Sequence, residues 1–256
     1  MPELQFFHLT DTGCVREENE DAVGAWPCED GLLFAVADGL GGYEGGQLAS
    51  SLALEVLSKE MAHASASRPV QKRLHQAVQR ANLEICTKAM TVPELRRMGT
   101  TLTASAVVGN TLVTAHVGDC RLYLMRAGTC TQLTKDHTRI WEQVEYGLLS
   151  REDARTHPQR HVLSRCLGHN VIPGIDLLQR PIQSGDILLQ CSDGVYTSLP
   201  ESEVMNILLK HPAEPACRTI IQRAREAGGH DNLSVQVVSV LSCPPTPPRR
   251  WWQLGA

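Results

Sequence analysis

The chain has 256 residues, of which 42% are hydrophobic and 20% are charged, and its formal net charge is −4 at pH 7. A chain of this length and composition can bury a substantial core, so intrinsic disorder is excluded. The small negative charge, without a long basic segment, argues against nucleic acid as a partner. The longest uninterrupted apolar stretch, residues 32–37, is far shorter than the roughly 20 residues of a membrane-spanning helix, so we expect no membrane span.

Hydrophobic periodicity predicts two strands near the start, at residues 4–9 and 32–37. Apolar residues that recur every three or four positions then predict two helices, over residues 48–61 and 70–85. Four strands follow, at residues 101–108, 112–117, 121–125 and 129–133. The turns between them are as short as Gly109-Asn110 and Ala127-Gly128, which requires antiparallel neighbours and excludes a doubly wound parallel sheet.

The second half continues with a short helix over residues 140–148 and a capping box, 150–153, that opens another helix. Strands are predicted at residues 187–190 and 233–241. Two helices fit between them, near residues 203–209 and 216–227. Strand runs separated by pairs of helices predict an α+β fold, in which packed antiparallel sheets are covered by helices.

The start of the chain lacks a basic segment followed by an apolar one, so no secretory signal is evident. Nine cysteines are scattered along the chain, none of them in a Cys-x-x-Cys pair. We interpret them as reduced and mostly buried thiols, which disfavours a zinc–thiolate site and predicts a cytoplasmic protein.

Acidic residues stand at predicted strand ends or in glycine-marked turns at six positions: Glu20, Asp21, Asp38, Asp119, Asp193 and Asp231. Asp38 and Asp193 each follow a buried apolar run, and each precedes a glycine that lets backbone and ligand approach closely. Like charges about 4 Å apart repel by roughly 4 kcal/mol at an effective dielectric near 20. If these acids converge, they must take up protons or hold cations. Oxygen ligands without histidine or thiolate favour Mg²⁺ or Mn²⁺, which predicts a metal-dependent enzyme.

Eight short motifs follow one another along the chain: residues 13–21, 38–42, 99–101, 118–121, 133–137, 163–168, 192–194 and 231–235. In this order they resemble the metal-dependent serine/threonine protein phosphatases of the 2C type, in their compact bacterial form, over residues 5–241. The resemblance implies a four-layer α-β-β-α sandwich, with two antiparallel sheets flanked by helix pairs. It also implies one catalytic domain over residues 1–242, with a flap at about residues 137–165.

The resemblance further implies a metal centre at one end of the sandwich. Asp38 would bridge two Mn²⁺ or Mg²⁺ ions, with the carbonyl oxygen of Gly39 as a further ligand. Asp193 and Asp231 would hold one ion, and Glu20 would serve the other.

Three further positions carry implied roles or a departure from the family pattern. Asp21, beside Glu20, would be a ligand or support the ligands, and Asp119 matches the aspartate that bacterial members use for a weaker third ion. Arg16 would bind the substrate phosphate through its planar guanidinium group. Leu40 stands where many eukaryotic members carry a histidine proposed to protonate the leaving group, so the general acid stays open.

The implied function is hydrolysis of phosphoserine and phosphothreonine in proteins, by direct attack of a water or hydroxide that bridges the metal ions. The protein would be a monomer that opposes a bacterial Ser/Thr kinase, with the kinase or its substrate as partner. Two alternatives stay open: a catalytically silent scaffold that binds metal and phosphoproteins, and a small-molecule phosphatase on the same fold. The complete set of Asp38, Asp193, Asp231 and Arg16 argues against the silent scaffold.

Residues 243–256 differ in composition from the rest of the chain and are rich in proline, arginine and tryptophan. Prolines at this density do not continue a sheet or a helix, so we expect a flexible tail in extended or polyproline form. The tail is a frayed terminus, a docking peptide for a partner, or a contact with a membrane surface.

Overall fold

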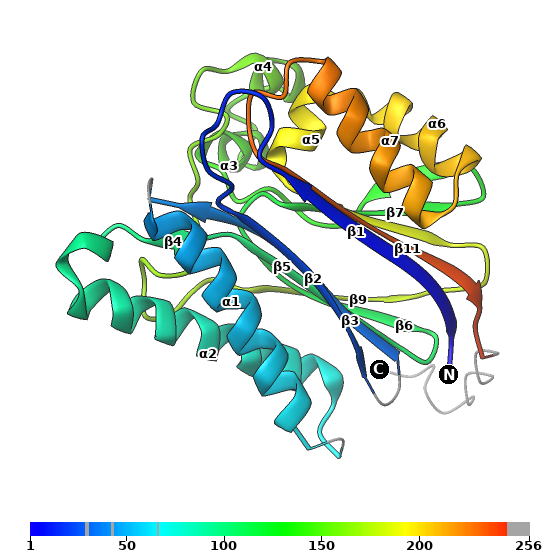
Figure 1. Ribbon diagram of the computed structural model, residues 1–256, viewed down its shortest axis with the longest axis horizontal. Helices are drawn as coiled ribbons and strands as arrows, with labels where there is room; N and C mark the ends of the chain where they lie inside the picture. The colour runs from blue at the N-terminus through cyan, green and yellow to red at the C-terminus, as the bar shows by residue number, and fades with distance from the viewer. Residues whose placement is uncertain (29–30, 42–43, 66, 245–256) are drawn as a thin grey trace.

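Two antiparallel sheets pack against each other in the protein, and helices cover their outer faces (Figure 1). This computed structural model describes residues 1–28, 31–41, 44–65 and 67–244, and the following statements concern those residues. Gly42, in the motif that begins at Asp38, and residues 245–256 of the expected tail lie outside the described residues. The architecture confirms the predicted four-layer α-β-β-α sandwich.

The first sheet has the order β1-β11-β10-β7-β8. Its strands are β1 (Glu3–Asp11), β11 (Leu233–Ser242), β10 (Ile187–Cys191), β7 (Arg121–Arg126) and β8 (Thr129–Gln132). The second sheet has the order β2-β3-β5-β6-β9, with β4 paired to the end of β3. Its strands are β2 (Asp21–Cys28), β3 (Gly31–Leu40), β4 (Gly99–Thr100), β5 (Leu102–Val108), β6 (Thr111–Val117) and β9 (Asp176–Pro181).

Helices flank both sheets. On the second sheet lie α1 (Glu44–His63) and α2 (Val70–Thr91), followed by the short 3₁₀ turn Pro93–Leu95. On the first sheet lie α5 (Asp193–Ser198), α6 (Glu201–Lys210) and α7 (Ala213–Glu226). Two short helices, α3 (Arg139–Glu145) and α4 (Arg151–Thr156), occupy the expected flap. No helix in the described ranges is both long and apolar enough to cross a membrane.

The alternation of side chains along β3 explains where Asp38 lies. Leu33, Ala35 and Ala37 belong to the core beneath α1 and α2, whereas Leu32 and Phe34 belong to the core between the sheets. Successive residues of a strand point to opposite faces, so Asp38 continues the series that faces the other sheet. The strand therefore delivers the carboxylate to one end of the space between the sheets.

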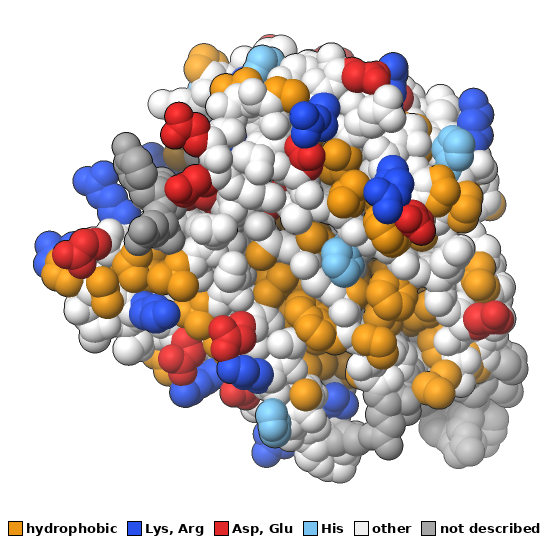
Figure 2. Space-filling model, in the orientation of Figure 1, with side chains coloured by type: hydrophobic (Ala, Val, Ile, Leu, Met, Phe, Trp, Pro, Cys, Tyr) orange, Lys and Arg blue, Asp and Glu red, His pale blue; other side chains and the backbone are white. Residues whose placement is uncertain are grey.

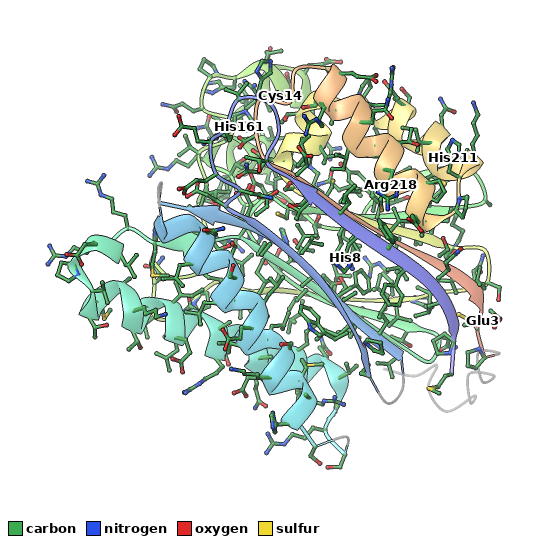
Figure 3. The ribbon with its side chains drawn as sticks, viewed as in Figure 1. Glu3, His8, Cys14, His161, His211 and Arg218 are labelled. Atoms are coloured by element: carbon green, nitrogen blue, oxygen red, sulfur yellow. The ribbon has the colours of Figure 1, made fainter. Side chains whose placement is uncertain are left out.

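The edge strands β1 and β2 lie side by side on one face of the sandwich (Figure 1). Figure 2 shows hydrophobic side chains gathered in the middle of this face, with charges of both signs scattered around them. Phe6 of β1 is a partly exposed hydrophobic residue, with 36% of its surface exposed. Glu3 lies at one end of β1, and Cys14 and His161 lie at the other end of the molecule (Figure 3).

Most predicted elements are confirmed, and the turns have the expected geometry, with φ values of 60° at Gly109, 48° at Ala127 and 78° at Gly128. The capping box is also confirmed, because Ser150 Oγ accepts a hydrogen bond from Asp153 N at 3.1 Å. The helix predicted over residues 140–148 ends at residue 145 instead. Gly147 follows with a φ of 70°, which a regular right-handed helix does not contain.

Three strands and one helix were not predicted. The strand β4 has only two residues and lies just before the strand predicted at residues 101–108. The strand β2 contains Gly24 and Pro27, which weaken a strand pattern and are tolerated here because β2 is an edge strand. The strand β9 is also an edge strand, and its residues are mostly exposed or half-buried. Asp193 was expected at the end of a strand, but it is the first residue of α5, a helix too short to show periodicity.

Candidate metal centre

Asp38 is held rigidly at the end of β3 by Thr100 of β4 and by Thr101, which follows it. Its backbone N–H donates to Thr101 Oγ1 at 2.9 Å, and its carbonyl oxygen accepts from Thr101 N at 2.8 Å and from Thr100 Oγ1 at 2.9 Å. Because these bonds fix the backbone on both sides, the carboxylate direction does not depend on a flexible loop.

Asp21 lies directly opposite Asp38 in the antiparallel pair of β2 and β3. Opposite residues of such a pair have Cβ atoms about 4.5–5.5 Å apart, so the two carboxylates are neighbours. Asp21 is buried, with 8% of its surface exposed, and its Oδ2 accepts a hydrogen bond from Ser192 Oγ at 2.7 Å. The bond to Ser192 ties the second sheet to the residue that precedes Asp193.

Glu20 reaches the same end of the sandwich through two close glycine contacts. Gly39 N donates to Glu20 O at 3.1 Å, and a Cβ atom on Gly39 would lie 2.2 Å from Gly46 O at the start of α1. A Cβ atom on Gly46 would likewise lie 2.2 Å from Glu20 Oε1. Position 39 therefore requires glycine, and a side chain at position 46 would displace the Glu20 carboxylate. Glu20 Oε1 is buried and has no hydrogen-bond partner in the described residues.

Asp231 and Arg16 form an ion pair at the rim of this cluster. Arg16 Nη2 donates to Asp231 Oδ2 at 2.9 Å, and the Arg16 side chain is 51% exposed. Asn232 holds the loop that carries Arg16, because its Nδ2 donates to Thr12 O and Glu18 O and its Oδ1 accepts from Glu20 N. Asn232 therefore links the turn that carries Asp231 to the loop that carries Arg16.

Asp193 begins α5 and faces the flap. His161 Nδ1 lies 3.3 Å from Asp193 Oδ2, which joins the end of the flap to the acidic cluster. A Cβ atom on Gly194 would lie 2.1 Å from Asn232 O, so α5 packs tightly on the turn that holds Asp231. Asp193 and Asp231, 38 residues apart in the chain, are brought to one place by this contact.

Asp119 lies in the turn after β6 and is buried, with 4% of its surface exposed. The turn is held by His137, whose Nδ1 accepts a hydrogen bond from Gly118 N at 3.0 Å. The other ring nitrogen, Nε2, is 3.2 Å from Asp176 Oδ2. His137 therefore has a structural role at the base of the flap.

Because the fold brings the acids close together, their charges act on one another's pKa values. Burial raises the pKa of Asp38 well above its usual value, and the charges of Asp21, Asp193, Asp119 and Asp231 raise it further. Burial also raises the pKa of Asp21, to about 7. The pKa of Asp119 is raised by burial and by Asp193, and that of Glu20 mainly by burial.

The side chains share a region without forming a finished coordination shell. Within the described ranges, no three His, Cys, Asp or Glu side chains are arranged so that they could hold a metal ion. Arg16 contacts Asp231 Oδ2, and His161 contacts Asp193 Oδ2. Each of these carboxylate oxygens would have to be available if the aspartate is to bind a metal ion. The donor set nevertheless fits a hard divalent cation, because it is made of oxygen atoms and includes the unpartnered Glu20 Oε1.

Sequence reasoning missed a second polar cluster beside the acids. Arg121 donates to Asp136 through Nε at 3.0 and 3.2 Å and through Nη2 at 2.6 Å, and its guanidinium carbon lies 3.6 Å from the centre of the Tyr196 ring. Arg121 Nη1 also donates to the Tyr123 hydroxyl at 3.1 Å. The motif at residues 118–121 contains Arg121, and its partner Asp136 lies in a different motif. The sequence therefore did not show that the two side chains pair.

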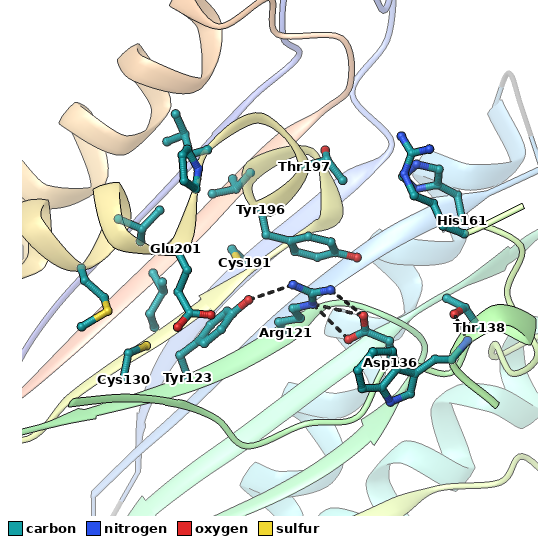
Figure 4. Close-up of a pocket in the computed structure, with 18 of the residues that line it drawn as sticks. Arg121, Tyr123, Cys130, Asp136, Thr138, His161, Cys191, Tyr196, Thr197 and Glu201 are labelled. Atoms are coloured by element: carbon teal, nitrogen blue, oxygen red, sulfur yellow. Dashed lines mark hydrogen bonds and ion pairs between the residues drawn. The ribbon is translucent and has the colours of Figure 1, made fainter. Parts of the chain in front are cut away.

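This cluster forms the floor of a pocket of about 480 Å³ between the flap and the helices α5 and α6 (Figure 4). His161 and Thr138 lie at one end of the pocket, and Cys130 and Glu201 lie at the other. Trp141 of α3 and Ala154 of α4 belong to the flap side of its wall. The pocket therefore adjoins the acidic cluster through His161.

Two packed antiparallel sheets with carboxylates gathered at one end are the arrangement that the resemblance to the 2C-type phosphatases implies. The sequence model described as Protein phosphatase 2C matches residues 15–238. The chain is 36% identical over 234 residues to the serine/threonine phosphatase stp of Listeria welshimeri, which covers 90% of this chain and 93% of that protein. The chain therefore belongs to the protein phosphatase 2C family.

Other relatives agree. The chain is 37% identical over 242 residues to the serine/threonine protein phosphatase PstP of Mycobacterium tuberculosis, which covers 93% of this chain and 45% of that protein. The crystal structure of the M. tuberculosis phosphatase PstP/Ppp matches with a TM-score of 0.85 and 36% identity over 93% of this chain and 98% of that one. A PstP catalytic domain in complex with two manganese ions matches with a TM-score of 0.83 and 34% identity, over 93% and 99%. The protein is a serine/threonine phosphatase of this family.

Proposed function

We propose that the acidic cluster is the catalytic centre and that Asp38 bridges two divalent cations. The observation that carries this proposal is the convergence of acids from separate segments. Asp21 lies opposite Asp38, and its carboxylate accepts a hydrogen bond from Ser192, next to Asp193. The close contact of Gly194 with Asn232 brings the start of α5 against the turn that carries Asp231. Asp193 and Asp231 would hold one cation and Glu20 the other, with the Gly39 carbonyl oxygen as a further ligand. Asp21 would be a ligand or support the ligands through its bond with Ser192, and Asp119 would hold a weaker third cation.

Paired Mn²⁺ or Mg²⁺ ions supply a nucleophile from water near neutral pH and offset charge on the phosphate. The chain's own groups orient the phosphate. Arg16 is an exposed cation at the rim, and its planar guanidinium suits two phosphate oxygens at once. On substrate binding, we propose that Arg16 exchanges its contact with Asp231 for the phosphate.

We also propose the setting in which the enzyme acts. Its substrates are phosphoserine and phosphothreonine proteins, so a serine/threonine kinase must supply them, and we propose that this kinase or its substrate is the physiological partner. We place the enzyme in the cytoplasm as a monomer. The nine cysteines are scattered along the chain without a Cys-x-x-Cys pair, which supports a reducing compartment.

Substrate class is tested by comparing phosphothreonine peptides with phosphorylated sugars and other small phosphate esters at saturating Mn²⁺. We expect kcat/KM for the peptides to be at least about tenfold higher, because a protein phosphatase gains binding energy from groups beyond the phosphate. A preference for the small esters would instead identify a small-molecule phosphatase. Metal binding without hydrolysis of either class would identify a silent scaffold.

A further prediction concerns Asp119. Replacing it with asparagine is expected to lower turnover by about 10- to 100-fold, the usual cost of removing a group that supports a metal site. Calorimetric titration with Mn²⁺ should then show the two tighter ions still bound. Glu152→Gln, at an exposed acid of α4, is the control and should leave both measurements unchanged. Loss of all metal binding in Asp119→Asn would contradict a separate third site.

A further inference from the structure

The pocket between the flap and α5 and α6 is not used by the reaction at the acidic cluster. Its volume of about 480 Å³ is within the roughly 300–1,000 Å³ of pockets that bind small ligands in proteins. Its wall is largely apolar, and the apolar residues come from the flap, the first sheet and the helices, including Ile140, Trp141, Leu189, Val195 and Met205.

The charged groups in its floor are already matched. Arg121 is paired with Asp136 by three hydrogen bonds and stacks on Tyr196, so this cation does not require an anionic ligand. Because this ion pair already satisfies its own hydrogen bonds, an apolar group placed against it leaves no polar group of the floor without a partner. The pocket is therefore suited to an aromatic or large aliphatic group.

The position of the pocket connects it with the reacting phosphate. Helix α5 begins with Asp193, and Val195, Tyr196 and Thr197 on the same helix line the pocket. A helix rises about 1.5 Å per residue, so Asp193 and Thr197 are about 6 Å apart along its axis. An extended peptide advances about 3.3 Å per residue. A side chain about two positions from the phosphorylated residue can thus reach the pocket.

We propose that this pocket is a specificity subsite that accepts an aromatic or large aliphatic side chain of the phosphoprotein substrate, one to three positions from the phosphorylated residue. The occupant is the substrate itself, because the pocket is continuous with the catalytic end through His161, which lines it and contacts Asp193. This inference rests on the proposed location of the catalytic centre. The subsite would determine which phosphoproteins the enzyme prefers.

The test fills the pocket from its far side. Met205 on α6 lines the pocket and lies away from the acids, and Met205→Trp places a bulkier side chain there. Its neighbour Asn206 is exposed and does not line the pocket, so Asn206→Trp is the matched control. Ala154→Leu, from the flap side, is a second filling variant in case Met205→Trp folds poorly.

The substrates are phosphothreonine peptides that carry phenylalanine or alanine at each of the three positions on either side of the phosphothreonine. We expect the wild type to prefer phenylalanine at one position by about tenfold or more in kcat/KM, the range over which an apolar pocket discriminates. Either filling variant should reduce this preference to about twofold or less. Hydrolysis of p-nitrophenyl phosphate should be unchanged in all variants, and Asn206→Trp should keep the preference.

Two results would overturn the subsite: no preference for phenylalanine at any position, or a preference that survives in both filling variants. Hydrolysis of p-nitrophenyl phosphate separates these failures from failure of the proposed catalytic centre. If the wild type hydrolyses p-nitrophenyl phosphate and Asp38→Asn does not, the catalytic centre holds and the outcome concerns the pocket alone. If both hydrolyse it equally, the catalytic assignment itself is wrong.

Discussion

Replacing Asp38 with asparagine is expected to lower Mn²⁺-dependent hydrolysis of p-nitrophenyl phosphate by about 10²- to 10³-fold, the cost of removing one well-placed electrostatic group from an active site. Asparagine has nearly the same shape, and the bonds to Thr100 and Thr101 involve only the backbone of residue 38, so the fold should be kept. The lost activity would then report the carboxylate charge that we assign to bridging two ions.

Activity and metal affinity should be measured together, with the thermal midpoint Tm as a check on folding. Glu152→Gln is a suitable control, because it also replaces a carboxylate with an amide, at an exposed position of α4. Equal rates in the wild type and Asp38→Asn would show that the chemistry takes place elsewhere.

The metal-free protein is expected to become less stable as the pH rises from about 4 to above 7. Burial raises the pKa of Asp21 from 3.8 to about 7, so the folded state holds this proton more tightly than the unfolded state does. Below the pKa that Asp21 has in the unfolded chain, it is protonated in both states and does not lower the free energy of unfolding. As the pH rises from that pKa to the pKa in the folded state, the free energy of unfolding falls progressively. At about 1.4 kcal/mol per pKa unit, ionising Asp21 costs on the order of 4 kcal/mol by pH 8. The pKa values of Asp38 and Asp119 are raised as well, so they act in the same direction.

Urea unfolding at pH 5 and pH 8, with metal removed by a chelator, measures this free energy. Asp21→Asn cannot ionise, so the difference between the two pH values should shrink in that variant. Mn²⁺ at about 100 times its Kd should restore roughly 2.7 kcal/mol at pH 8, since it binds the folded state. A metal-free wild type that is more stable at pH 8 than at pH 5 would contradict the raised pKa values.

Hydrophobic patterning determined much of the fold without the structure. The short turn at Gly109-Asn110 forces antiparallel pairing, because a parallel connection needs a dozen or more residues. The apolar run of β3 likewise fixes that Asp38 stands at the end of a buried strand. These features are local, so a single segment contains the information that specifies them.

The edge strands β2 and β9 could not be predicted in this way. Each is covered on fewer sides than β3, so selection for apolar residues is weaker and their patterns are indistinct. Helix α5 was missed because six residues are too few for a helical period to appear. The roles of the acids as metal ligands remain predictions, because motif order implies them and the geometry shows only their proximity.

The sequence by itself determined the order of the motifs, the antiparallel sheets and the identity of the acids that gather at one end. Only the tertiary structure decided that Arg16 pairs with Asp231, that His161 contacts Asp193 and that a pocket lies beneath the flap. These contacts join residues from distant segments, and their geometry depends on how sheets and helices pack. Local patterns specify which face of an element is buried, but not which side chain of another element it meets.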